Sequence, residues 1–308
     1  MKKLLLTLVV IATVTGGMWL IRQKDAHQAR PQTSGALEAL QFLGAIQTYP
    51  SGDIPAQAQF AAWLRAKRMP LASEAGYRTA PWESMGPHNR GGRMLSLTFN
   101  PLRPATLYAG SASGGLWRSY TGGEGALAWH RVETGFPVLG VSCIAFPPAD
   151  SNLIFIGTGE VYNLAAVGTG AAYRNTRGSV GIGILRSTDG GQTWHKSLDF
   201  TMSQEKGVWD IVVAPSAPHI VYAATTDGVY KSMNAGESWT LVLDVPMATD
   251  LVVHPDDANK VVVACGNFES PGHGLYRTTN GGSVLAQGHL PRLACQLPRQ
   301  SPTGHGAF

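Results

Sequence analysis

This 308-residue chain has few charged residues and few cysteines, and its net charge is small. Only 14% of its residues are charged, against about 25% in an average soluble domain. Its three cysteines, Cys143, Cys265 and Cys295, are odd in number and widely spaced, which argues against a disulfide framework or a zinc site. The net charge of +4 is diffuse and no nucleic-acid-binding motif is present. We therefore expect no cofactor, no metal and no nucleic-acid partner.

The N-terminus predicts export. Lys2 and Lys3 precede an apolar run from Leu4 to Ile21, which is typical of a signal sequence over residues 1–24. The run is also near the lower length limit for a membrane span. No cysteine stands at its end, which argues against a lipid anchor. A cleaved signal and an uncleaved anchor both remain open, so a membrane contact is expected only through this segment. The product is periplasmic, extracellular or anchored.

Residues 25–81 differ from the rest of the chain in the spacing of their apolar residues. Apolar residues at helical spacing predict two short helices, Ala36–Ile46 and Ala56–Arg68, in a lead-in and linker segment. We expect these helices to pack against the following domain, although a partner-binding helix is an alternative.

A short turn motif recurs through the following domain. Its best copy runs from Ser187 to Trp194, and each copy follows an apolar run that ends in a basic residue. Asp or Asn accepts bonds from turn amides, Gly permits positive φ, and Trp packs the hairpin on its neighbour. The motif is therefore expected to be structural. Its residues are Ser187, Asp189, Gly191, Trp194, Ser232, Asn234, Gly236, Trp239, Thr278, Asn280 and Gly282.

A second repeat precedes each turn motif. Four apolar strands end at Pro101, Pro148, Pro215 and Pro255, and another strand follows each proline. Each unit thus reads as four antiparallel strands, which is the pattern of a propeller blade. The sequence predicts an all-β fold, a β-propeller of four-stranded antiparallel blades over residues 82–282. About four blades are present, so the ring is incomplete.

The turns resemble the Asp-box (BNR) repeats of sialidase-type and sortilin-type β-propellers. The run from Trp82 to Arg93, with Leu107–Arg118 and Gly157–Glu160, resembles exported bacterial proteins with a sortilin-like N-terminal propeller. The resemblance implies the fold and export. It does not specify an activity, because one architecture hosts many functions.

The second blade carries a long Gly-rich insertion between its second and third strands. Long loops in compact domains often carry function. The candidate ligand contacts are Glu160, Tyr162, Tyr173, Arg174 and Arg177, with Arg93 at the start of an inner strand.

Asp210 and Asp250 also lie near the starts of inner strands, where they could face a central channel with Arg93. A pocket of one base and two acids could handle a polar substrate. The aspartates occupy equivalent repeat positions, however, which favours a structural role in each blade.

Enzyme families set requirements that this chain does not meet. Endoglucanases that cut xyloglucan carry an acid in a Tyr-Ala-Arg-Thr-Asp-Ile-Gly-Gly stretch, and Ala112 stands at that place here. Glycosidases need two carboxyl groups across the scissile bond. Sialidases need an arginine cluster and a Tyr–Glu pair, and no such pattern is recognisable. We expect no catalytic residues.

The segment 283–308 breaks the repeat. After Gly282 the motif requires Ser/Thr-Trp, but Ser283-Val-Leu-Ala follows and then an aberrant or disordered tail. A frameshifted or truncated piece of a longer propeller accounts for this. We interpret the chain as a non-catalytic module that binds protein or glycan, with an incomplete sialidase-like glycoside hydrolase as the alternative.

The signal sequence generates a direct test. Cell fractionation is expected to recover the chain outside the cytoplasm, because Lys2, Lys3 and the apolar run target it for translocation. A soluble cytoplasmic product that retains Met1 contradicts the prediction.

Overall fold

The computed structural model divides the chain into two units, Met1–Gly52 and Asp53–Phe308, and the second holds every strand. The signal segment, the tail beyond 288 and four insertion candidates, Tyr162, Tyr173, Arg174 and Arg177, lie outside the described residues. In the part that is described, no helix is long and apolar enough to span a membrane. The described residues are 42, 45–46, 49–50, 56–69, 92–125, 127–137, 140–161, 179, 181–203, 206–266, 270–282 and 286–288.

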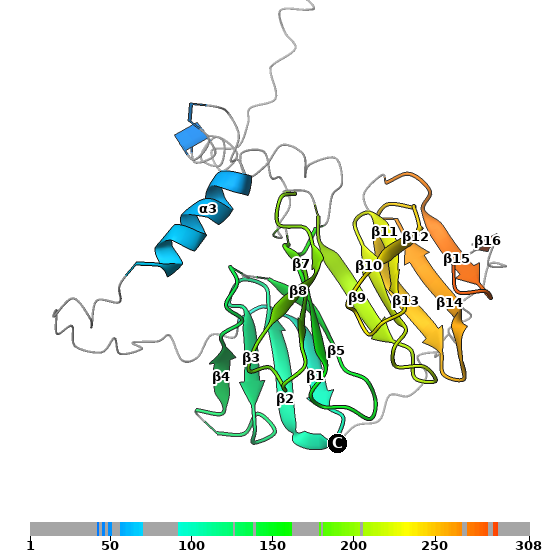
Figure 1. Ribbon diagram of the computed structural model, residues 1–308, viewed down its shortest axis with the longest axis horizontal. Helices are drawn as coiled ribbons and strands as arrows, with labels where there is room; N and C mark the ends of the chain where they lie inside the picture. The colour runs from blue at the N-terminus through cyan, green and yellow to red at the C-terminus, as the bar shows by residue number, and fades with distance from the viewer. Residues whose placement is uncertain are drawn as a thin grey trace, which may run out of the picture. The chain divides into compact units, whose positions relative to one another are not determined.

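The fold is all-β and consists of four antiparallel four-stranded sheets, each formed by consecutive strands (Figure 1). These are the blades of a β-propeller. The first sheet contains β1 (Met94–Asn100), β2 (Arg103–Ser111), β3 (Leu116–Ser119) and β4 (Trp129–Val132). The second contains β5 (Val141–Ala145), β6 (Ile154–Thr158), β7 (Gly183–Ser187) and β8 (His195–Asp199).

The third sheet contains β9 (Val208–Val213), β10 (Val221–Thr225), β11 (Gly228–Ser232) and β12 (Thr240–Leu243). The fourth contains β13 (Ala248–His254), β14 (Asp257–Cys265), β15 (Gly274–Thr278) and β16 (Ala286–Gly288). Strand β16 lies beyond residue 282, within the segment that the sequence assigned to the tail. Because it pairs with β15, the fourth sheet has its full set of strands.

Consecutive sheets pack face to face, and their inner strands β1, β5, β9 and β13 adjoin in that order. We call the face toward the next sheet along the chain the forward face and the opposite one the rear face. Between the first two sheets, Tyr108 and Leu116 of the forward face pack on Ile144, Ile156 and Leu185 of the rear face. Equivalent apolar clusters join the second sheet to the third and the third to the fourth. This burial is the main stabilising contribution to the array.

Strand burial follows from this layering. All five residues of β6 and all five of β10 are buried, because each strand is covered on both faces. Strand β14 of the fourth sheet instead alternates between buried and exposed residues over much of its length. The alternation is the signature of a sheet that is covered on one face.

The repeated turn is closed by its own side chains. The hydroxyl of Ser187, which is fully buried, donates to Asp189 Oδ1 at 2.8 Å and accepts from the Gly191 amide at 2.9 Å. Asp189 Oδ1 in turn accepts from the Thr193 amide at 2.9 Å. Ser232, Asn234 and Gly236 repeat the same bonds, as do Thr278, Asn280 and Gly282. The hydroxyl thus satisfies an amide that the tight turn would otherwise leave unpaired.

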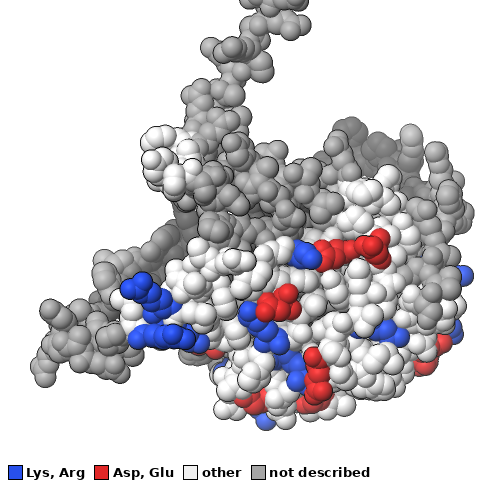
Figure 2. All heavy atoms as spheres, turned by 45° about the horizontal axis from the view of Figure 1, so that its top comes forward, with Lys and Arg blue, Asp and Glu red and all other residues white. Residues whose placement is uncertain are grey.

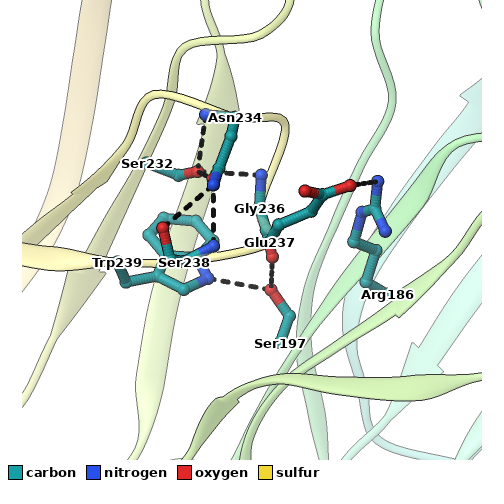
Figure 3. Close-up of polar contacts among 8 residues, drawn as sticks. All are labelled: Arg186, Ser197, Ser232, Asn234, Gly236, Glu237, Ser238 and Trp239. Atoms are coloured by element: carbon teal, nitrogen blue, oxygen red, sulfur yellow. Dashed lines mark hydrogen bonds and ion pairs between the residues drawn. The ribbon is translucent and has the colours of Figure 1, made fainter.

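The turns also join neighbouring sheets. Ser197 of β8 donates to the Gly236 carbonyl and accepts from Trp239 Nε1 at 2.8 Å, so one hydroxyl of the second sheet holds the turn of the third (Figure 3). Arg186 Nη2 lies 3.8 Å from Glu237 Oε1 of the same turn.

In the interfaces between the first and second sheets and between the third and fourth, a basic residue on the forward face bonds to the repeated turn of the following sheet. Arg118 donates to the Gly190 carbonyl at 3.2 Å, and Lys231 donates to the Gly281 carbonyl at 3.1 Å. Each cation also lies over a tyrosine ring of its own sheet, Arg118 over Tyr108 and Lys231 over Tyr222. These are the bases that end the apolar runs in the sequence.

Helix α3 (Ala56–Lys67) packs on the sheets rather than standing apart. Trp63 stacks on Phe136 with ring centroids 6.2 Å apart, and Lys67 Nζ donates to the Gly135 carbonyl at 2.9 Å. Lys196 of β8 lies 4.5 Å from the Phe60 ring centroid. Arg65 and Lys67 in the last turn suit the negative end of the helix dipole.

The turn geometry predicts unequal costs of substitution. Trp194 is 5% exposed, so Trp194→Ala should lower the free energy of unfolding by about 3 to 5 kcal/mol through the cavity it leaves. Ser187→Ala should cost about 1 to 3 kcal/mol, because the Gly191 amide loses its acceptor. Denaturant unfolding measures both.

Gln192→Ala is the matched control, since Gln192 is exposed in the same turn and its loss should change stability by less than about 0.5 kcal/mol. If Trp194→Ala and Ser187→Ala unfold like the parent, the structural role of the turn is wrong.

Candidate functional site

In each blade the same backbone hydrogen bond joins the end of the second strand to the start of the inner strand. The residue after the second strand donates its amide to the carbonyl of a residue just before or at the start of the inner strand. We call the carbonyl residues the rim position. The bonds are Ala112 to Arg93 at 3.0 Å, Gly159 to Gly140 at 3.1 Å, Thr226 to Gly207 at 3.1 Å and Gly266 to Met247 at 2.8 Å.

Arg93 departs from this repeat. The other rim positions hold Gly140, Gly207 and Met247, none of which carries a charge. Arg93 instead extends from the first blade to Glu160 of the second and donates from Nη1 and Nη2 to the two carboxylate oxygens at 2.5 and 2.6 Å. The Glu160 side chain is 2% exposed, whereas that of Arg93 is 40% exposed. This bidentate pair gives a buried carboxylate a cationic partner and leaves part of the guanidinium in contact with solvent.

The same glutamate anchors the long insertion. Glu160 and Ser179 form an antiparallel bridge, in which the Ser179 amide donates to the Glu160 carbonyl at 3.0 Å. Nearby, the Gly181 amide donates to the Lys206 carbonyl at 2.7 Å. The two ends of the insertion are thus fixed next to each other, beside the Arg93–Glu160 pair. Sequence reasoning named both residues of that pair but did not foresee that they bind each other.

Asp210 and Asp250 form a second pair. Their side chains are hydrogen bonded to each other, and Asp210 Oδ1 also accepts from the Ile211 amide at 2.8 Å. Burial, together with the charge of Asp250, raises the pKa of Asp210 from 3.8 to about 6, although the Ile211 and Leu251 amides act in the opposite direction. Asp210 therefore holds its proton to a higher pH than a free aspartate does.

The geometry of this pair is unsuited to glycoside cleavage. Glycosidases hold their two carboxyl groups about 5 to 9.5 Å apart, so that a glycosidic bond or a water fits between them. Asp210 and Asp250 bond directly to each other, and Asp210 also accepts from backbone amides of β9 and β13. They therefore link adjacent inner strands, whereas the sequence predicted a structural role for each within its own blade.

Ala112 lies at the rim, where its amide bonds to the Arg93 carbonyl and its methyl group is 8% exposed. An alanine side chain can neither donate nor accept a proton. The place at which the sequence comparison expected an acid is therefore chemically inert.

Other chemistry is sparse in the described residues. No group of three or more His, Cys, Asp or Glu side chains within them could hold a metal ion. Cys143 and Cys265 are buried thiols, and burial raises the pKa of both, which disfavours the reactive thiolate. On the face shown in Figure 2, basic and acidic side chains lie beside one another.

Comparison with curated proteins finds xyloglucanases. The chain is 26% identical over 259 residues to xyloglucanase Xgh74A of Acetivibrio thermocellus, covering 73% of this chain and 29% of that protein. It is 25% identical over 194 residues to a xyloglucanase of Hypocrea jecorina, covering 58% of this chain and 21% of that protein. The chain thus spans less than a third of the length of these relatives. No family model matches it.

Solved structures with a related chain trace include an ancestral GH74 enzyme, with a TM-score of 0.49, 21% identity, and coverage of 69% of this chain and 26% of that one. Another is the GH74 xyloglucanase from Xanthomonas campestris, with a TM-score of 0.46, 18% identity, and coverage of 64% and 30%.

The raised pKa of Asp210 predicts that stability depends on pH. The pKa of Asp210 is raised from 3.8 to about 6, so the folded state binds its proton more tightly than the unfolded state. The stability from this proton is complete below about pH 4 and is lost as pH rises through 6. Between pH 4 and 7, the thermal midpoint of the parent should therefore fall relative to that of Asp210→Asn, whose amide does not titrate.

Among the described residues, Asp250 of β13 and Cys143 of β5 interact electrostatically with Asp210. Asp250→Asn removes the neighbouring charge and should reduce the same pH dependence. Parallel curves for the parent and Asp210→Asn contradict the prediction.

Proposed function

We propose that this chain is an exported, non-catalytic propeller module that binds a plant-type β-glucan of the xyloglucan class. The observation that carries the ligand class is the similarity to xyloglucanases over 73% of the chain. The turns add support for an Asp-box propeller of the sortilin-like kind. The apolar run Leu4–Ile21 supports export.

The carboxyl groups at the rim support binding without cleavage. Both carboxylate oxygens of Glu160 accept from Arg93, so neither is free to deliver a proton to a substrate as a general acid must. Asp210 and Asp250 are bonded to each other, and Ala112 replaces the acid expected at its place. The candidate carboxylates Glu160, Asp210 and Asp250 thus each bond to another residue of the protein.

We place the ligand over the Arg93–Glu160 pair. The half-exposed guanidinium can donate hydrogen bonds to sugar hydroxyls, and the carboxylate of Glu160 orients it. Tyr162, Tyr173, Arg174 and Arg177 of the insertion complete the proposed contacts, because both ends of the insertion meet at this pair. Tyrosine rings that stack on sugar faces and arginines that bind hydroxyls are the expected chemistry of such a site.

A glycoside hydrolase is the second candidate, and the names of the relatives favour it. It requires an acid and a base outside the groups described above. A protein ligand for the same surface is a further possibility that the glycan assays separate.

Retardation of the native chain in gels containing xyloglucan tests the proposal, together with release of reducing ends from the same polysaccharide. We expect retardation and no release. Arg93→Ala combined with Glu160→Gln should weaken binding at least about tenfold, or about 1.4 kcal/mol, without leaving a buried charge unpaired.

Arg131→Ala is the matched control, because Arg131 is an exposed arginine of the same sheet paired with exposed Glu133. It should bind like the parent. Release of reducing ends by the native chain would overturn the non-catalytic assignment in favour of the hydrolase, and an absence of retardation would overturn the glycan ligand.

A further inference from the structure

Glu160 has a counterpart one blade further along the chain. In the first three blades, the residue that donates the rim bond is followed by Ser113, Glu160 and Asp227 respectively. Asp227 thus occupies the repeat position of Glu160, in the short turn between β10 and β11. The same end of two adjacent blades therefore carries a carboxyl group at the same place in the repeat.

Asp227 also has a cationic partner, Lys206, which stands directly before the rim residue Gly207. Lys206 Nζ donates to Asp227 Oδ2 at 2.6 Å, and the Tyr230 hydroxyl donates to the same oxygen at 3.0 Å. Burial, together with the charge of Asp227, raises the pKa of Tyr230 to about 12, so the phenol keeps its proton and remains a donor. The two bonds fix the orientation of the carboxyl group.

Lys206 and Asp227 keep polar atoms open for a ligand. Asp227 Oδ1 accepts no hydrogen bond from the described residues, and the side chain is 23% exposed. An ammonium group has three donors, of which Lys206 uses one on Asp227 while its side chain remains 34% exposed. In Glu160, by contrast, both carboxyl oxygens are bonded to Arg93. The third blade therefore presents a free acceptor beside free donors.

A buried aromatic ring holds this polar group in place. Phe200 is 5% exposed, and Lys206 Nζ lies 5.2 Å from its ring centroid, a contact that attracts the cation to the ring. The Tyr230 ring packs on the same phenylalanine with centroids 6.0 Å apart. Because Lys206 and Tyr230 are already restrained, a ligand that binds here orders few additional side chains.

The main chain joins this group to the part of the second blade that carries Glu160. Gly207 approaches that blade so closely that a Cβ added to it would lie 3.1 Å from Val161 Cγ2. The Lys206 carbonyl also accepts from the Gly181 amide at the end of the insertion. Lys206 therefore lies beside the base of the insertion, between the two acids of the repeat position.

From this arrangement we infer that Lys206 and Asp227 form a second sugar-binding subsite, which takes two adjacent hydroxyl groups of one pyranose ring in the proposed glycan. One hydroxyl would donate to Asp227 Oδ1, and its neighbour would accept from Lys206 Nζ. Since the two charges offset each other, the group suits a neutral polar ligand better than an ion. The inference rests on the proposed function and extends the glycan from the second blade to the third.

Calorimetric titration of the full chain with xyloglucan oligosaccharides of one and of two repeating units tests the subsite. The parent should bind the longer ligand more tightly, because only that ligand fills both subsites at once. Lys206→Gln combined with Asp227→Asn should weaken binding of the longer ligand at least about tenfold, through lost hydrogen bonds to charged groups. Binding of the shorter ligand should be unchanged, so the advantage of length disappears.

Lys260→Gln combined with Asp257→Asn is the matched control. These residues form an ion pair at 3.2 Å at the start of β14, whereas the rim bond lies at the end of that strand. This variant should keep the full advantage of the longer ligand. Asp227→Asn alone is the second test variant, because it preserves the shape of the side chain, and it should reduce the advantage if the double variant melts below the parent.

Failure of the subsite and failure of the proposed function give different results. If the Lys206 and Asp227 variants melt like the parent and keep the full advantage of length, the subsite is wrong while the site at Arg93 stands. A parent that binds both ligands equally tightly overturns the subsite as well, because a single site then accounts for binding. A parent that binds neither ligand overturns the glycan assignment and the subsite together.

Discussion

Packing of one sheet's forward face on the next sheet's rear face is the interaction on which this structure depends. Each interface combines an apolar cluster with a polar tie to the next turn, such as Arg118 to Gly190 or Ser197 to Gly236. A four-stranded sheet cannot bury both of its faces alone, so stability comes from nearest-neighbour contacts, as in other repeat proteins. The repeated turn matters because it fixes the carbonyl that the preceding sheet binds.

Repetition separates structural from functional residues. Asp210 and Asp250 recur at one repeat position and form bonds between inner strands, which gives both acids a structural role. Arg93 has no charged counterpart at the other rim positions, yet it reaches across two blades to a buried glutamate. This departure from the repeat is the reason that we place the proposed ligand at Arg93. The insertion begins at that same glutamate.

Much of the fold could be predicted from the sequence because its determinants are local. The proline-ended strands and the Ser187–Trp194 turn each encode their own geometry within a few residues. The Arg93–Glu160 bond joins residues 67 positions apart, and it depends on how two sheets meet. The raised pKa of Asp210 and the exposure of Val262 also depend on how the sheets meet. Strand β16 was missed because its residues break the motif that marked the other blades.

Native-state hydrogen exchange of the inner strands tests the central claim most directly, because it reports the stability of each sheet separately. The account predicts that in dilute solution the amides of β5 and β9, whose sheets are covered on both faces, exchange only through global unfolding. Those of β1 and β13 should exchange through openings of lower free energy. Equal protection of all four inner strands in dilute solution contradicts the account.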